Sequence, residues 1–347
     1  MIVDKRYCSC AFLQVRTLAG SDRCFSEKYK PNLWQRERKP DAVNTSEDLV
    51  NKLQDQIDEC CSKGKVALAL SGGIDSAVLA KCMPKGSTAY TFKCTIPGMS
   101  VTDETPRAKN YASECGLDHR IVNIYWEDFE KYAPVLMKHK GAPIHSIEVQ
   151  IYKAALQALK DGFDTIIFGE SADLNYGGLS DLLSKERTVG EFIDRYNYVH
   201  PYYVLKDPLI LTKPFENYVR TDGTFDTHEF CRGIFLHEAM GSYSNACECA
   251  GIKLITPYVN TWLGPELDYE RIRSGENKYI IRDAFKQLYP GYIAPPKTPM
   301  PRPMDEWMSK WEGPQRPEFW PNCTSHMKGD QKWLVWALEK FLNLIDE

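Results

Sequence analysis

The chain has 347 residues, of which 43% are hydrophobic and 26% charged, so it is long enough for two domains or one large one. These proportions are typical of a soluble globular protein, and no apolar run approaches the roughly 20 residues of a membrane-spanning helix. The formal net charge of −4 argues against binding nucleic acid through overall positive charge.

The amino terminus and the cysteines indicate a cytoplasmic protein. Residues 1–16 carry charges and cysteines where a signal peptide would have an uninterrupted apolar segment. The twelve cysteines include the C-x-C pairs Cys8/Cys10 and Cys247/Cys249, without a C-x-x-C motif or a histidine at zinc-ligand spacing. We therefore expect reduced thiols, and a structural metal that joins the two pairs is the less favoured alternative.

Residues 1–64 are expected to form an N-terminal extension. A short strand is predicted at 12–16, an exposed connector at 30–43 and a helix at 45–61. The helix is predicted because Leu residues and an isoleucine recur at spacings of four behind a Thr-Ser cap.

From residue 65 the pattern alternates between strand and helix. The continuous apolar run that begins this segment is typical of a strand covered on both faces in a parallel sheet. The predicted order is strand 65–70, helix 75–83, strand 88–96, helix 103–116, strand 119–124, helix 126–139, helix 146–162 and strand 164–170. A proline within the helix at 126–139 predicts a kink or break there. This alternation predicts an α/β fold, a parallel sheet with helices on both faces, over residues 65–180.

After residue 180 the alternation stops. Helices are predicted at 191–199, 227–251, 277–291 and 331–345, with a proline- and aromatic-rich loop at 291–321. We expect residues 181–347 to form a mainly helical region that completes the active site.

The loop Ser71–Ser76, with the sequence SGGIDS, follows the first strand of the predicted sheet. Its glycines allow a ligand to approach the backbone closely, and successive N–H groups before a helix suit a phosphate. Asp75 would repel phosphate on its own, so its place in the loop predicts a divalent cation between them. An ordinary capped turn is the alternative interpretation.

The same loop resembles the S-G-G-x-D-S loop of the N-type ATP pyrophosphatases, the PP-loop family with an adenine nucleotide α-hydrolase-like fold. A second segment, "GESADLNYGG" at 169–178, is similar to the G-E-G-S-D-E-x-x-G-G segment of the asparagine synthetases within that group. The matching residues are Gly169, Glu170, Asp173, Gly177 and Gly178. A solvated turn is the alternative for Glu170 and Asp173.

This resemblance implies that Asp75 and Asp173 hold Mg²⁺ on the pyrophosphate of ATP. The sequence departs from the family at Leu174, where asparagine synthetases have a second acid. Related β-lactam-forming synthetases also lack that acid, so the departure bears on asparagine formation more than on ATP chemistry.

A third match lies near residue 280. The segment "GENKYIIRDAFKQLYPGYIAPPKTPMPRP" resembles the family segment that opens a helix with its catalytic lysine, so Lys278 is aligned with that lysine. Arg282 is aligned with the helix arginine and Lys297 with a later lysine, although Pro295 replaces the family's arginine before it. Glu104 matches a helix position and is expected to be structural. The resemblance covers roughly residues 60–300.

The resemblance implies an ATP-dependent ligase with ATP and Mg²⁺ as its nucleotide and metal. Such a ligase would adenylate a substrate carboxylate with the help of Lys278 and release pyrophosphate. It would then pass the acyl group to ammonia or an amine that Glu170 positions. The residues expected to contact ATP are Leu70, Ser71, Gly72, Gly73, Asp75, Ser76, Cys94 and Gly169.

The source of nitrogen and the substrates stay open. Asparagine synthetases begin with a glutaminase domain whose cysteine follows Met1, whereas this chain has Ile2 and only about 64 residues before the first strand. We therefore expect no glutaminase activity in the chain and nitrogen from free ammonia, a separate glutaminase or an amine substrate. The competing interpretations are a PP-loop enzyme that activates an RNA base and a nucleotide-binding module without catalysis.

Overall fold

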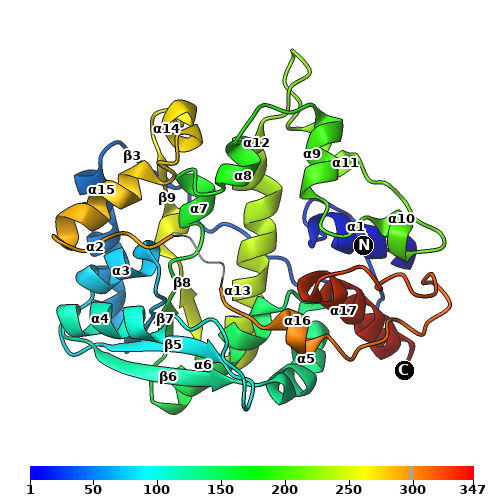
Figure 1. The fold of residues 1–347 in the computed structure, drawn as a ribbon, viewed down its shortest axis with the longest axis horizontal. Helices are drawn as coiled ribbons and strands as arrows, with labels where there is room; N and C mark the ends of the chain where they lie inside the picture. The colour runs from blue at the N-terminus through cyan, green and yellow to red at the C-terminus, as the bar shows by residue number, and fades with distance from the viewer. Residues whose placement is uncertain (297–299) are drawn as a thin grey trace.

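A five-stranded parallel sheet, at the lower left of Figure 1, has the strand order β6–β5–β4–β7–β8. The computed structural model describes residues 1–296 and 300–347, so the predicted site residue Lys297 lies outside the described residues. The strands are β4 (Val66–Ala69), β5 (Thr88–Cys94), β6 (Asp118–Ile124), β7 (Thr165–Ile167) and β8 (Lys253–Ile255). Two further strand pairs are β1 (Ile2–Val3) with β2 (Arg23–Cys24) and β3 (Asp41–Val43) with β9 (Thr261–Leu263).

Helices cover both faces of the sheet, as predicted. One face packs against α2 (Ser46–Lys63), α3 (Ile74–Cys82), α4 (Thr105–Cys115) and α15 (Tyr279–Leu288), and the other against α5 (Trp126–Lys140), α6 (Ile147–Lys160) and α13 (Leu236–Ala250). Side chains of β4 alternate between the two cores: Leu68 joins the first and Ala67 the second. Because both sides are buried, the strand is apolar throughout.

The amino- and carboxyl-terminal helices lie side by side at the right of Figure 1. They are α1 (Lys5–Val15) and α17 (Gly329–Asp346), and Lys5 forms an ion pair with Asp346. The remaining elements are α7 (Ala172–Asn175), α8 (Ser180–Leu183), α9 (Val189–Tyr196), α10 (Pro201–Val204), α11 (Lys213–Glu216), α12 (Thr227–Phe230), the π-helical turn η1 (Cys231–Phe235), the 3-10 turn η2 (Pro257–Asn260), α14 (Tyr269–Arg273) and α16 (Met304–Trp307).

The sheet extends beyond the predicted core at 65–180. Its fifth strand, β8, comes from residues 253–255 in the region that was expected to be mainly helical. Strand pairing with β7 makes this three-residue segment a strand, and so short a segment carries almost no periodic signal of its own.

Two other local predictions, the strand at 12–16 and a break of the helix at Pro134, are wrong. Residues 12–15 belong to α1 and not to a strand, because Asp4 caps the helix by accepting a hydrogen bond from Tyr7 N at 2.9 Å, and one helix face is buried. The helix α5 continues through Pro134 without a break, since a proline removes a single backbone hydrogen bond that the surrounding packing outweighs.

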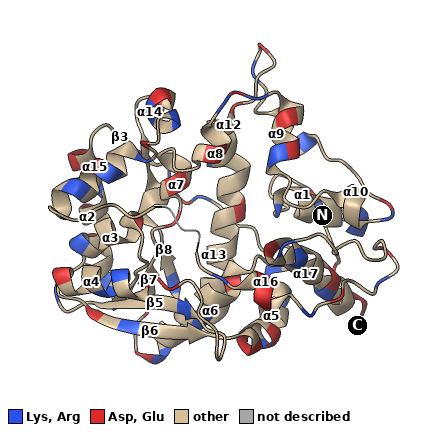
Figure 2. Ribbon diagram, in the orientation of Figure 1, with Lys and Arg blue, Asp and Glu red and all other residues tan. Residues whose placement is uncertain are grey.

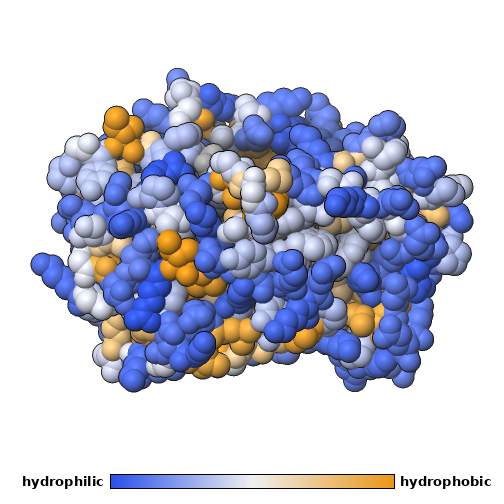
Figure 3. All heavy atoms as spheres, turned by 60° about the horizontal axis from the view of Figure 1, so that its bottom comes forward, coloured by the Kyte–Doolittle hydropathy of each residue, from blue (hydrophilic) through white to orange (hydrophobic). Residues whose placement is uncertain are grey.

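The surface carries both signs of charge. Lys and Arg lie beside Asp and Glu on the same helices, such as α4, α9 and α15 (Figure 2). Hydrophilic residues cover most of the face in Figure 3, where hydrophobic residues form separate groups. The cysteines of the described residues are thiols that lie outside disulfide bonds. Within residues 1–296 and 300–347 we find no helix that combines the length and the hydrophobicity needed to cross a membrane.

Candidate active site

The candidate site lies where the strand order reverses, at the carboxyl ends of β4 and β7. The chain runs outward from β4 to β5 and β6 and then returns to the other side of β4 with β7. Ligands of open parallel sheets bind at such a reversal, because the loops that follow the two strands diverge there. Two adjoining cavities of about 180 and 390 Å³ open between the loops after β4 and β7. We call them the nucleotide cavity and the reaction cavity.

The glycine loop Ser71–Ser76 leads from β4 into α3. Ser76 Oγ accepts a hydrogen bond from Ser71 N at 3.0 Å, and Ser71 Oγ accepts one from Gly73 N at 3.1 Å. Gly73 caps α3 without a side-chain hydrogen bond, so the first N–H groups of that helix face the loop. The serines thus shape the loop, and the helix amino terminus supplies the positive end of its dipole.

Three predicted catalytic and metal-binding side chains meet at one point. Lys278 Nζ lies 2.7 Å from Asp75 Oδ2 and 3.1 Å from Asp173 Oδ1. Lys278 is buried, with 5% of its surface exposed. Burial alone would lower the pKa of its ammonium, but the carboxylates of Asp75 and Asp173 raise that pKa above the ordinary value. Lys278 is therefore charged, and its ammonium lies between the two carboxylates and offsets one of their two negative charges.

The two carboxylates also suit Mg²⁺. They approach a common point, as their shared contact with one ammonium demonstrates, and they offer oxygen donors, which Mg²⁺ prefers. Two carboxylates leave most of an octahedral shell for phosphate oxygens and water. Among the described residues there is no cluster of three or more His, Cys, Asp or Glu side chains that suits a metal ion.

The backbone before α15 aims Lys278 at the aspartates. Lys278 has φ +53°, in the left-handed region, which is uncommon for a residue with a side chain. Arg282 stabilises this turn because its Nε donates to Asn277 O at 2.8 Å and its Nη2 donates to Asn277 Oδ1 at 2.8 Å. Arg282 also lines the reaction cavity, so it holds the turn from inside the site.

Glu170 lines both cavities and has a raised pKa. Its Oε1 accepts a hydrogen bond from Ser171 N at 2.8 Å, and Tyr243 donates to the same carboxylate. Burial, reinforced by the charges of Asp173 and Glu238, raises the pKa of Glu170 to about 7. A carboxylate with this pKa exchanges protons near neutral pH, which suits a general base.

Two glycines of the second segment allow close packing around the carboxylates. A Cβ added to Gly178 would overlap the carboxylate of Asp173 and lie 2.8 Å from its Cα. A Cβ added to Gly169 would lie 3.3 Å from Ser76 N. Glycine at these positions therefore lets the loops after β4 and β7 approach each other.

The nucleotide cavity includes most of the residues predicted to contact ATP. Leu70, Ser71, Asp75, Ser76 and Gly169 line it, while Gly72 and Gly73 line the reaction cavity. Cys94 is buried at the end of β5 and is not among the described residues that line either cavity. The wall on that side is formed by Tyr90, Thr91 and Phe92 of β5, together with Phe168. Nothing in the sequence pointed to these residues, because they lie within or next to strands and belong to none of the motifs described above.

The far wall of the reaction cavity was also missed. It includes Phe235, Glu238, Ala239 and Tyr243, from the end of η1 and from α13, and Arg302 from the proline-rich loop. The recurrence of Phe235, Ala239 and Tyr243 at spacings of four is the one signal that places them on a single helix face.

Comparisons with known proteins agree with these motifs. The model of a family described as asparagine synthase matches residues 48–238. The NH₃-dependent NAD⁺ synthetase of Carboxydothermus hydrogenoformans is 30% identical over 132 residues, which are 38% of this chain and 51% of that protein. The chain thus spans about half the length of this curated relative.

Solved structures of two synthetases and a thiolase are also similar. The NH₃-dependent NAD synthetase of Campylobacter jejuni has 17% identity and a TM-score of 0.27, over 39% of this chain and 61% of that chain. The NMN synthetase of Francisella tularensis has 13% identity and a TM-score of 0.30, over 74% of this chain and 100% of that chain. A U34-tRNA thiolase of Methanococcus maripaludis has 14% identity and a TM-score of 0.31, over 86% of this chain and 79% of that chain.

Proposed function

The chain belongs to the asparagine synthase family, and we propose that it is an ATP-dependent ligase that forms an amide through an acyl-adenylate. The substrate carboxylate is activated with release of pyrophosphate, and ammonia or an amine then takes the acyl group. The observation that carries this proposal is the convergence of Lys278, Asp75 and Asp173 beside the glycine loop.

Asp75 and Asp173 would hold Mg²⁺ against the phosphates of ATP. The bound ion supplies positive charge that offsets the charge of the departing pyrophosphate. The glycine loop and the amino terminus of α3 bind the phosphates through backbone N–H groups.

Lys278 stabilises the negative charge that grows at the α-phosphate when the substrate carboxylate attacks. An oxygen of that carboxylate bonds to the α-phosphorus, and the bond from that phosphorus to the bridging oxygen breaks, so pyrophosphate leaves. Because the Lys278 ammonium is buried and positioned before the reaction, its stabilisation of this charge is stronger than in water.

Glu170 accepts a proton from the attacking nitrogen in the second half-reaction. The nitrogen lone pair attacks the acyl carbon, and the bond from that carbon to the AMP oxygen breaks. A pKa of about 7 makes Glu170 a sufficient base at neutral pH and lets it release the proton afterwards.

The test is to incubate the protein with Mg²⁺, ATP, hydroxylamine or ammonia, and a panel of carboxylic acids. We expect pyrophosphate, AMP and a hydroxamate or amide with at least one acid, whereas ADP and orthophosphate would contradict adenylation. Asp75→Asn and Lys278→Met should each slow pyrophosphate release by about 10²-fold or more. The matched control is Lys286→Met in α15, the helix that Lys278 caps. The Lys286 side chain is 72% exposed, so its loss should leave the site unchanged.

A further inference from the structure

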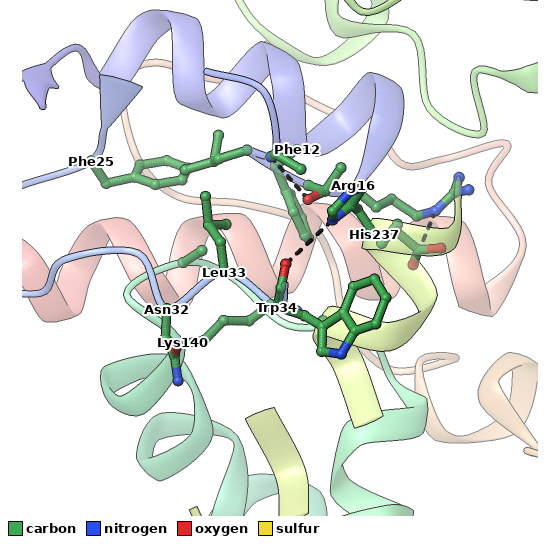
Figure 4. A pocket seen from close by; sticks show the side chains of 14 residues that line it. Phe12, Arg16, Phe25, Asn32, Leu33, Trp34, Lys140 and His237 are labelled. Atoms are coloured by element: carbon green, nitrogen blue, oxygen red, sulfur yellow. Dashed lines mark hydrogen bonds and ion pairs between the residues drawn. The ribbon is translucent and has the colours of Figure 1, made fainter. Parts of the chain in front are cut away.

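A third, smaller cavity lies behind the far wall of the reaction cavity. It has a volume of about 20 Å³, enough for roughly one water molecule, and lies between α1, residues 32–34 and α13. Figure 4 shows Arg16 reaching from the end of α1 across this cavity toward the helix that carries His237. Glu238, the next residue, lines both this cavity and the reaction cavity. The N-terminal segment therefore contacts the back of the active-site wall.

Arg16 contacts two residues of that wall. Its Nε lies 3.5 Å from Glu238 Oε1, and its guanidinium carbon lies 5.8 Å from the centre of the Phe235 ring. Its Nη2 donates to Tyr196 Oη at 2.9 Å, and the guanidinium also lies 4.9 Å from the centre of that ring. The side chains of Arg16 and Glu238 are only 11% and 7% exposed. A buried arginine with these contacts fixes the position of both wall residues.

Together with lining residues of the segment 170–179, the far wall that Arg16 supports gives the reaction cavity both apolar side chains and carboxylates. Leu174, Leu179, Phe235 and Ala239 provide the apolar part. Glu170 and Glu238 provide the acidic part. These two carboxylates are close enough for the charge of Glu238 to affect Glu170.

Of the positive groups around this cavity, Arg16 is paired with Glu238, and Arg282 donates its hydrogen bonds to Asn277. Arg302 Nη2 lies 3.1 Å from Asp330 Oδ1. Burial and the charge of Arg302 lower the pKa of His145 well below its ordinary value, so the ring is neutral. Lys278 is held between Asp75 and Asp173 on the other side of the cavity. A cation at the wall would be stabilised by the Glu170 carboxylate, while Glu238 would share its charge between that cation and Arg16.

We propose that this wall binds the amine substrate as an organic ammonium with an apolar body, and that Arg16 is the residue that positions Glu238 and Phe235 for it. The ammonium lies between Glu170 and Glu238, and the apolar body covers Leu174, Leu179 and Phe235. Free ammonium would leave the apolar surface uncovered.

The catalytic use of this amine rests on the proposed function. The ammonium gives one proton to Glu170, its nitrogen attacks the acyl carbon, and AMP leaves with the electron pair of the broken C–O bond. The second N–H proton passes to the phosphate of the released AMP. Binding of the amine needs neither ATP nor the acid substrate, so it can be measured separately.

The experiment measures calorimetric binding of three probes to the full chain: 2-phenylethylamine, its neutral analogue 2-phenylethanol, and ammonium chloride. We expect 2-phenylethylamine to bind at least roughly tenfold more tightly than either of the others, the range of a charge-assisted hydrogen bond. Glu238→Gln and Arg16→Met should each weaken its binding by roughly tenfold. Arg16→Lys, which keeps the charge, should recover part of that loss.

Two controls separate positioning from a general structural role. The dissociation constant for ATP should stay unchanged in Arg16→Met, because Arg16 does not line the nucleotide cavity. The matched surface variant is Arg195→Met, whose side chain is 51% exposed and pairs with Asp181 at 3.1 Å. It should bind all probes like the natural protein.

Equal binding of 2-phenylethylamine and 2-phenylethanol, or undiminished amine binding by Glu238→Gln, would overturn the proposal. If Arg16→Met fails to fold, Glu238→Gln and Phe235→Ala decide the matter through the same binding assay. Pyrophosphate release without amine binding would refute this inference alone. Amine binding without pyrophosphate release from any acid would refute the proposed function alone.

Discussion

The nucleotide side and the far wall of the reaction cavity are built in different ways. The nucleotide side comes mainly from short loops directly after β4 and β7, whose order in the sheet brings Asp75 and Asp173 together. The far wall comes from α13 and the proline-rich loop, and it is supported by Arg16 from the N-terminal segment. Under the proposed function, ATP binding would depend on sheet topology, whereas selection of the other substrates would depend on packing between distant segments.

The largest effect should come from Lys278→Met, which removes the cation between the two aspartates. We expect pyrophosphate release to fall about 10²–10³-fold, the range seen when one group that stabilises transition-state charge is lost. Two partly buried carboxylates without their ammonium should also destabilise the fold by about 2–3 kcal/mol in the absence of Mg²⁺.

Urea unfolding with and without Mg²⁺ tests this second effect. Added Mg²⁺ should recover part of the lost stability of Lys278→Met, because the ion supplies positive charge to the same carboxylates. The control Lys286→Met should change the free energy of unfolding by less than about 0.5 kcal/mol. Unchanged stability of Lys278→Met would show that Asp75 and Asp173 do not depend on this cation.

Gly178→Ala tests whether close packing of the loop after β7 positions the metal-binding side. The new methyl group would overlap the Asp173 carboxylate, so we expect a loss of about 1–3 kcal/mol in stability and a large loss of ATP turnover. The matched control is Gly190→Ala in α9, where an added Cβ meets no atom within 4 Å. That variant should be more stable by about 0.5 kcal/mol because alanine favours a helix, and its activity should be unchanged.

Glu170 lines both cavities, and Glu170→Gln tests whether its raised pKa makes the stability of the protein depend on pH. The folded-state pKa of about 7 exceeds the unfolded value of 4.5, so the folded protein favours the protonated carboxyl group. The contribution of Glu170 to stability is therefore complete below pH 4.5 and is lost as the pH rises through 7. Glutamine does not titrate, so the variant should gain stability relative to the natural protein by up to about 1.4 kcal/mol per pH unit over that range.

Unfolding curves measured at several pH values for both proteins give this difference directly. A constant difference would mean that the Glu170 carboxyl group titrates normally in the folded protein. In the activity assay, the natural protein should gain rate as the pH rises to about 7, and the variant should lack this rise.

The smallest effect should come from Cys94→Ala. Because Cys94 is buried and does not line either cavity among the described residues, the KM for ATP should change by less than about twofold, equivalent to roughly 0.4 kcal/mol. A much larger change in KM would indicate that Cys94 contributes to ATP binding after all.

The sequence allowed the α/β class and four of the five sheet strands to be predicted, because alternating apolar segments and glycine stops are local signals. Asp75, Asp173 and Lys278 were proposed as site residues because they lie in motifs that resemble those of a known family, and the structure brings the three side chains together. The short strand β8 and the helical state of residues 12–15 depend on tertiary partners, which single-sequence patterns do not reveal. The same holds for the ion pair of Arg16 with Glu238, which joins residues far apart in the chain.

The late position of β8 in the chain also has a consequence for synthesis on the ribosome. Strand β7 pairs with β4 on one side and with β8 on the other, and β8 is made only after the whole of α13. Until residues 253–255 emerge, Thr165–Ile167 present an open sheet edge to other chains. Lys278 is made later still, so a nascent chain carries Asp75 and Asp173 for a period without their ammonium. Synthesis of residues 253–278 therefore supplies the last strand of the sheet and the ammonium that offsets part of the negative charge at the site, and chains that stop earlier are the ones exposed to aggregation.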